Sequence, residues 1–238
     1  MLRLPFSIRE RQDLLMLNIR KNIQLIALMP IPLANFFGGI DQLISPKVDV
    51  NVIAEKEFSL DNRYPIPSVN EVFKKNILLN LAYLDGKVDS PKDIKWDQIN
   101  KPFSFEFELK PDKTFAFHED VEAKYKQSLV KTTNAHFNAQ EGFKTDGYLF
   151  GDGVCHLASL IYWAAKEAGL SAEAPTNHDF MKIPDVPKEY GVSIYNNPNT
   201  KGSNTQQNLY ITNNKGKPIT FKFEYQDNKV KISVSEIN

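Results

Sequence analysis

The sequence predicts an α+β protein: an antiparallel sheet with a central helix that carries Cys155 at its N-terminus, plus an apolar segment near the start of the chain. Three observations lead to this class. Some stretches repeat apolar residues at helical spacing, others alternate apolar and polar residues as strands do, and the two kinds occur in separate runs. A chain of 238 residues, 42% hydrophobic and 24% charged, has room for one sizeable domain and an extension.

Residues 1–45 are predicted to be a signal peptide or a signal anchor. Residues 1–22 contain five basic and two acidic side chains, and residues 23–40 contain no charge. This asymmetry predicts that the body of the protein lies outside the cytoplasmic membrane, in the cell envelope. Whether 23–40 is cleaved, and whether the chain starts at Met1 or Met16, stays open. A buried helix is the alternative, because two prolines and only eighteen residues make a poor membrane span.

Residues 46–100 are predicted to form an extension with one strand and one helix. Val48, Val50 and Val52 alternate with polar residues, so 47–54 is expected to be a strand with one buried face. Ser68 and Glu71 have the spacing of a capping box, and the apolar residues behind them recur at helical spacing up to Asp85-Gly86. We assign this helix to packing rather than to chemistry.

Residues 101–238 contain most of the predicted strands. Apolar residues alternate with polar ones over 103–109, and a turn at 110–113 leads into a short strand at 114–117. Near the C-terminus, 208–212 and 219–225 are predicted to be strands joined by a turn, and Asp227-Asn228 turns into a third strand over 230–234. The stretch 175–208 is rich in Pro, Asn, Gly and Thr and is expected to form loops.

The motif Gly151-Asp152-Gly153-Val154-Cys155-His156 opens a helix that runs to about residue 168, with Asp152 or Gly153 as its N-cap. A cysteine in the first turn lies at the positive end of the helix dipole, which lowers a thiol pKa and favours the nucleophilic thiolate. The nearby amides can also stabilise an oxyanion. The other interpretation is structural, because a free cysteine is often a small buried apolar residue.

A nucleophilic Cys155 needs a base, and His178 is the best candidate. The helix from Cys155 to residue 168 is about 20 Å long, and an extended chain from residue 170 to His178 covers about 26 Å, so a returning segment brings His178 level with Cys155. Asp179 is one candidate for an orienting group, beside Asp185 and Asn196. Gly151, Asp152 and Gly153 are candidate binding residues, and Tyr148 and Tyr162 can line the same cleft.

Several classes of function are not expected. A single cysteine excludes an intrachain disulfide and any zinc site built on cysteines, and the four histidines lack metal-ligand spacing. We therefore expect no metal and no cofactor. Lys plus Arg and Asp plus Glu are equal at 29 each, so no net field favours a nucleic-acid partner.

Residues 101–236 resemble the VanW-like family. The resemblance rests on Gly-Tyr at 147–148, the motif from Gly151 to Tyr162, Ala-Gly-Leu at 168–170, and weaker matches at 110–118 and 208–219. The family pattern there is Gly-Gly-Gly-Val-Cys-Gln. This chain departs from it at Asp152, which replaces the middle glycine, and at His156, which replaces glutamine. Ala158 replaces a serine, and 192–193 lacks the Asp-Ala that the family often has.

The resemblance implies an exported cell-envelope protein that binds peptidoglycan or its precursors or acts as an accessory to them, with no biochemical activity established for the family. A shorter likeness, to the transglutaminase-like arrangement, rests on Gly153-Val154-Cys155 and the helix end at 168–170. It implies a thiol-dependent acyl-transfer enzyme (an amidase, peptidase or transpeptidase) with a Cys155–His178 dyad. Both hypotheses stay open at the level of sequence.

Overall fold

A computed structural model describes residues 50–147, 151–197 and 199–237, and it confirms the α+β class. The strands and the helices are β1 (Val50–Ser59), α2 (Pro67–Asp85), α3 (Trp96–Ile99), β2 (Phe103–Leu109), β3 (Thr114–Ala116), β4 (Leu129–Lys131), α4 (Val154–Glu167), β5 (Ser171–Glu173), α5 (Lys201–Asn204), β6 (Tyr210–Thr212), β7 (Ile219–Gln226) and β8 (Lys229–Ile237). Within the described residues, four single-turn 3₁₀ helices occur in the connections.

The larger sheet has the strand order β1-β8-β7-β2 and is antiparallel throughout. The predicted turn at Asp227-Asn228 is confirmed, since both residues have positive φ, 51° and 56°, as a two-residue hairpin turn requires. The alternating phenylalanines of β2 pair with those of β7, and the rings of Phe105 and Phe223 stack at 4.9 Å. These aromatic residues belong to the core, as their spacing predicts.

A second sheet has the order β4-β3-β6-β5 and includes a parallel pair, β3 with β4. One antiparallel sheet was expected, with 208–212 turning directly into 219–225. Instead β6 pairs with β3 and β5, while β7 joins the larger sheet. Asn213, which directly follows β6, explains the change of sheet. Its side-chain amide donates to the carbonyl of Leu109, at the end of β2, and to the carbonyl of Lys217, shortly before β7. These two bonds hold the chain where it passes from one sheet to the other.

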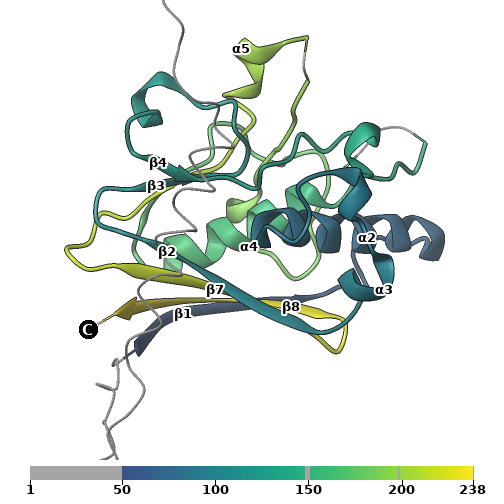
Figure 1. The fold of residues 1–238 in the computed structure, drawn as a ribbon, viewed down its shortest axis with the longest axis horizontal. Helices are drawn as coiled ribbons and strands as arrows, with labels where there is room; N and C mark the ends of the chain where they lie inside the picture. Colours follow the sequence, from purple (N-terminus) through teal and green to yellow (C-terminus); the bar gives the residue numbers. More distant parts are fainter. Residues whose placement is uncertain (1–49, 148–150, 198, 238) are drawn as a thin grey trace, which may run out of the picture. The chain divides into compact units, whose positions relative to one another are not determined.

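The helix α4 lies between these elements, as predicted for the helix that carries Cys155. It contacts β1 and β8 of the larger sheet, β5 of the second sheet, and α2 (Figure 1). Its apolar stripe, which includes Leu157, Ile161 and Ala164, is fully buried, and Gly169 adopts the left-handed conformation where the helix ends. The sheet and both helices therefore share one core.

Two expectations about the extension are wrong in detail. Val50 and Val52 are 54% and 56% exposed, because β1 is an edge strand with a bulge between Val52 and Ala54 that changes the face presented to the core. Val48 lies outside the described residues.

No capping box forms, because α2 begins at Pro67, whose ring presets the first helical φ, so Ser68 lies inside the helix. The predicted end at Gly86 is confirmed.

Residues from 50 to 100 are built into the same compact unit as the rest of the described chain, through the β1–β8 pairing and the contacts between α2 and α4. The predicted signal segment, 1–45, lies outside the described residues. Among the described helices, none combines the length and hydropathy needed for a membrane crossing.

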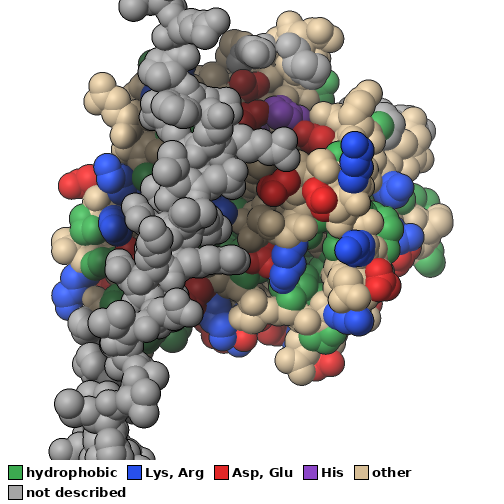
Figure 2. All heavy atoms as spheres, in the orientation of Figure 1, with side chains coloured by type: hydrophobic (Ala, Val, Ile, Leu, Met, Phe, Trp, Pro, Cys, Tyr) green, Lys and Arg blue, Asp and Glu red, His purple; other side chains and the backbone are tan. Residues whose placement is uncertain are grey.

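Basic and acidic side chains are interspersed on the face shown in Figure 2, in keeping with the net charge of zero. Several form pairs across neighbouring strands, such as Lys229 with Glu57 at 2.7 Å on β8 and β1. Exposed pairs of this kind contribute about 0–1 kcal/mol each, so the buried core supplies most of the stability.

The start of α4 is pressed against the main chain of α2. Gly153, the residue before α4, has φ = 97°, and a Cβ atom placed on it would lie 2.8 Å from the carbonyl oxygen of Phe73. Only glycine satisfies both conditions. The glycine at 153 is therefore required by the contact between two helices that are 80 residues apart in the sequence.

We expect Gly153→Ala to destabilise the protein by about 3 kcal/mol or more, because it adds steric overlap to an unfavourable φ. Gly86→Ala is the matched control. Gly86 also has positive φ, 78°, but nothing lies within 4 Å of an added Cβ, so only the backbone cost of about 1–2 kcal/mol is expected. Urea unfolding of both variants measures the difference. Equal losses would contradict the close approach.

Candidate functional site

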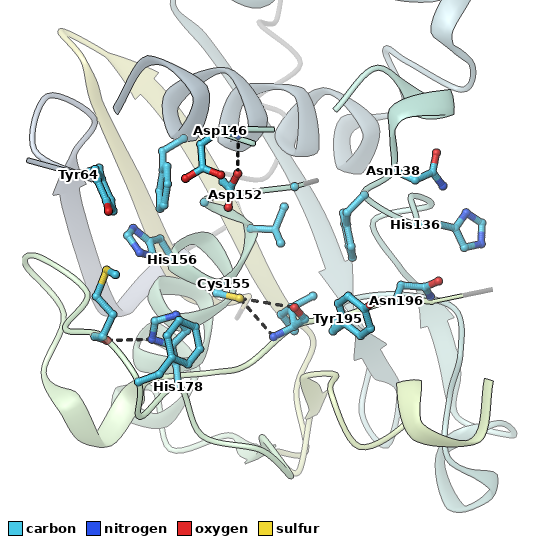
Figure 3. Close-up of a pocket in the computed structure, with 18 residues that line it drawn as sticks. Tyr64, His136, Asn138, Asp146, Asp152, Cys155, His156, His178, Tyr195 and Asn196 are labelled. Atoms are coloured by element: carbon cyan, nitrogen blue, oxygen red, sulfur yellow. Dashed lines mark hydrogen bonds between the residues drawn. The ribbon is translucent and has the colours of Figure 1, made fainter. Parts of the chain in front are cut away.

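A cavity of about 460 Å³ opens beside the first turn of α4 (Figure 3). The helix start contributes Asp152, Cys155 and His156 to its wall. The opposite walls come from segments distant in the sequence, which carry Tyr64, Phe73, His136, Asp146, His178 and Tyr195. The cavity therefore joins aromatic rings, neutral hydrogen-bonding groups and carboxyl groups in one space.

Asn76 of α2 holds the turn that begins the motif, and the side chain of Asn76 is fully buried. Its amide donates to the carbonyls of Lys144 and Asp152, at 3.0 and 2.9 Å, and its Oδ1 accepts from the Lys144 N–H at 2.8 Å. Gly151 has φ = 83° and lies against the main chain of Phe137. The two glycines are thus explained by backbone packing, and Asn76 aligns the turn with the helix.

The loop after α4 crosses back over the helix start. Ser159 of α4 donates to the carbonyl of Cys155 and accepts from the Val192 N–H at 2.9 Å. The His178 N–H donates to the carbonyl of Gly191 at 3.2 Å. These bonds bring His178 and Ile194 to the cavity that Cys155 also lines.

The thiol of Cys155 is bonded to main chain, not to a base. Sγ donates to the carbonyl of Ile194 at 3.5 Å and accepts from the Ile194 N–H at 3.4 Å (Figure 3). Burial raises the pKa of Cys155 to about 11. The sequence led us to expect a lowered pKa, but the loss of solvent outweighs the helix dipole here. At neutral pH the thiol is protonated.

His178 is a neutral, buried side chain. Its Nδ1 lies 3.0 Å from the carbonyl of Met181, so Nδ1 carries the proton, and burial lowers the pKa of the ring. The ring packs against Phe180, with centroids 4.0 Å apart. Among the described residues, no hydrogen bond joins Cys155 Sγ to a histidine ring. Asp179 is exposed and does not line this cavity.

His156 is also neutral, because burial sets the pKa of its ring well below the usual value and Arg63 adds to this effect. Its ring lies between Phe73 and His178, with centroid distances of 5.0 and 6.1 Å. Only 2% of the residue is exposed, and its Nδ1 has no hydrogen-bond partner among the described residues. The wall of the cavity therefore contains a polar group whose hydrogen-bonding capacity is unused.

Asp152 and Asp146 form a carboxyl pair at the cavity wall (Figure 3). The Asp146 N–H donates to Oδ2 of Asp152 at 3.2 Å. Burial, together with the charge of Asp146 and a hydrogen bond with its side chain, raises the pKa of Asp152 to about 6, although the bond from the Asp146 N–H acts in the opposite direction. Asp152 is a half-buried carboxyl group that changes charge near neutral pH, which is the behaviour expected of a ligand-binding or acid–base group.

On the far side of the cavity His136 is held between two carboxylates. Its Nδ1 contacts Glu141 at 2.6 Å, its Nε2 contacts Glu119, and its own N–H donates to Glu141 at 2.7 Å. Burial alone lowers the pKa of His136, but the two carboxylates outweigh it and the pKa is raised. The charge of this imidazolium is therefore compensated within the protein.

The structure brings most of the predicted site residues together. Cys155, His178, Gly151, Asp152 and Gly153 line the cavity. Tyr162 does not, because it points to Tyr190, 6.1 Å away between ring centroids, and Tyr148 lies outside the described residues. Their roles stay predictions. In the described part of the chain no three His, Cys, Asp or Glu side chains gather in a way that could hold a metal ion.

Sequence reasoning missed several wall residues: Tyr64, Phe73, His136, Phe137, Asn138 and Asp146. Tyr64 and Phe73 precede the region of family likeness, and Phe73 looks like an ordinary member of an apolar stripe. Only Asp146 gave a signal, since it lies six residues before Asp152. The other contacts depend on loop paths that no local pattern reveals.

The fold and the site define a small α+β protein in which a glycine-rich helix start opens on a mixed aromatic and polar cavity. A family model described as VanW like protein matches residues 106–235, which is more than half of the chain. The chain belongs to the VanW-like family, as its motif led us to expect. Searches of curated proteins and of solved structures returned no match. The strand β1 and the helix α2 precede the matched residues.

We expect iodoacetamide to label Cys155 in the folded protein at least tenfold more slowly than a free thiol at pH 8, because the reaction needs thiolate. The rate should rise with pH toward about 11, the pKa that burial gives this thiol. The same single cysteine in urea is the control and should react at the rate of a free thiol. A midpoint below about 8.5 in the folded protein would contradict the assignment.

Proposed function

We propose that this protein is exported to the cell envelope and binds peptidoglycan or one of its precursors non-covalently, in the cavity at the start of α4. Membership in the VanW-like family and the basic-then-apolar pattern of residues 1–40 support the location. The cavity supports a binding role, because its lining combines aromatic rings with hydrogen-bonding side chains, as pockets for small polar ligands do.

The observation that carries the proposal is the exposed apolar rim of this cavity. Phe180, Met181 and Tyr195 are 76%, 45% and 41% exposed, and all three line the opening. Large apolar side chains held at the mouth of a polar cavity are typical of a surface that is covered when a ligand binds. A peptide or sugar segment can use the rim for apolar contact and the interior for hydrogen bonds.

A thiol-dependent acyl-transfer enzyme is the second candidate, favoured by one observation: Cys155 and His178 line the same cavity. The protonated, main-chain-bonded thiol argues for binding without covalent chemistry. Mass spectrometry of the protein after incubation with peptidoglycan fragments separates the two. A covalent adduct on Cys155 that disappears in Cys155→Ser would replace binding by catalysis.

The first test is binding of soluble peptidoglycan fragments to the full-length protein, measured by isothermal titration calorimetry. Phe180→Ala combined with Tyr195→Ala should weaken binding about tenfold, because two aromatic contacts at the rim are lost. Val130→Ala is the control, since Val130 is 52% exposed but does not line the cavity. Cys155→Ser should bind like the wild type.

Two outcomes contradict the proposal. Equal affinity in the rim variant and the control would exclude this cavity as the binding site. Recovery of untagged full-length protein from the soluble cytoplasm, rather than from the envelope fraction, would contradict the proposed location.

A further inference from the structure

We infer that the cavity recognises a protonated amino group on its ligand, held by Asp152 together with the ring of His156. The inference rests on the proposed binding function and names the part of the ligand that enters the interior. It states that the site prefers a positively charged group on the ligand.

The charges around the cavity favour a cation. Among the described residues that line it, Asp146 and Asp152 contribute carboxyl groups, and none is a lysine or an arginine. Arg63, which influences His156, lies outside the lining and is paired with Asp185 at 2.6 Å. His156 and His178 are neutral, and the charge of His136 is compensated by Glu119 and Glu141. The described lining therefore offers an entering ammonium group the carboxyl group of Asp152 and no lysine or arginine.

His156 supplies an independent observation. A buried polar atom without a partner is unfavourable, so proteins retain one mainly where a ligand or an ion completes the hydrogen bonding. The ring of His156 is neutral, and its buried Nδ1 has no hydrogen-bond partner among the described residues. A neutral imidazole has one nitrogen able to accept a hydrogen bond, and an ammonium group has three N–H bonds to donate. The ring and the carboxylate of Asp152 are thus complementary to the same chemical group.

Aromatic faces complete the environment. The rings of Tyr64 and Phe73 are tilted, with centroids 5.5 Å apart, and the centroid of Phe73 in turn lies 5.0 Å from that of His156. Aromatic rings attract cations through the negative charge on their faces, especially where water is excluded. The arrangement of carboxylate, acceptor and ring is that of a site for an alkylammonium ion.

The side chains of Asp152 and His156 do not set the backbone of the motif. Gly151 and Gly153 supply the left-handed backbone, and Asn76 holds the turn through the carbonyl of Asp152 rather than through its side chain. The side chains at 152 and 156 are therefore available to set ligand preference.

The test uses the full-length protein and a matched pair of probes, Nα-acetyl-lysine methylamide and its Nε-acetylated form, with affinity measured by NMR titration. The free amine should bind about tenfold more tightly, the difference expected for one charge-assisted hydrogen bond. Asp152→Asn and Asp152→Gly should abolish the difference. Asp97→Asn is the control, because Asp97 is an exposed carboxylate outside this cavity. Thermal unfolding verifies that each variant is folded.

The pH dependence supplies a second readout. A lysine amine stays protonated from pH 5 to 8, whereas the carboxyl of Asp152 ionises near pH 6. Affinity for the free amine should therefore rise between pH 5 and 7 and stay flat for the acetylated probe. Burial lowers the pKa of His156 and His178, and two carboxylates raise the pKa of His136, so the same pH series on Asp152→Asn separates the ionisation of Asp152 from that of the histidines.

The outcomes separate the two proposals. Equal affinity for the two probes, or a preference that survives Asp152→Asn, overturns the amine site. Binding of the amine through Asp152 without any binding of peptidoglycan fragments supports the amine site and overturns the proposed function. Binding of peptidoglycan fragments without a preference for the free amine supports the proposed function and overturns the amine site.

Discussion

The close approach of α4 to the main chain of α2 is the constraint on which the site depends. Gly153 permits that approach, and Asn76 uses all of its polar atoms to fix the turn in front of the helix. Without this contact the first turn of α4 would not be buried, and its side chains would face solvent. Asn76 of α2 positions the turn, and the turn positions Cys155, His156 and the carboxyl of Asp152.

Burial then decides the chemistry of the groups that this contact encloses. Desolvation raises the pKa of Cys155 and of Asp152 and lowers the pKa of His156 and His178, so each group favours its uncharged form. A helix dipole is a small effect beside the loss of water. The groups at the start of α4 are thus a protonated thiol, a neutral imidazole and a carboxyl group near its titration point, which suits reversible recognition better than nucleophilic attack.

Local patterns predicted the regular elements well where one face of an element is buried. The alternation of Phe103, Phe105 and Phe107 located β2, and the helical spacing before Gly86 located α2. The same reasoning failed for Val50 and Val52, because a bulge on an edge strand reverses the faces without any sign in the sequence. It also joined β6 to β7, whereas Asn213 sends these strands to different sheets through bonds to residues distant in the chain.

The sequence by itself determined the α+β class, the helix that begins after Gly153 and the family. These depend on spacing, turn residues and chain length, which are local quantities. Only the tertiary structure decided that the thiol is bonded to Ile194, that Asp146 pairs with Asp152, and that His156 lacks a partner. Those properties depend on which segments exclude water from each atom, and burial by distant segments cannot be read from neighbouring residues.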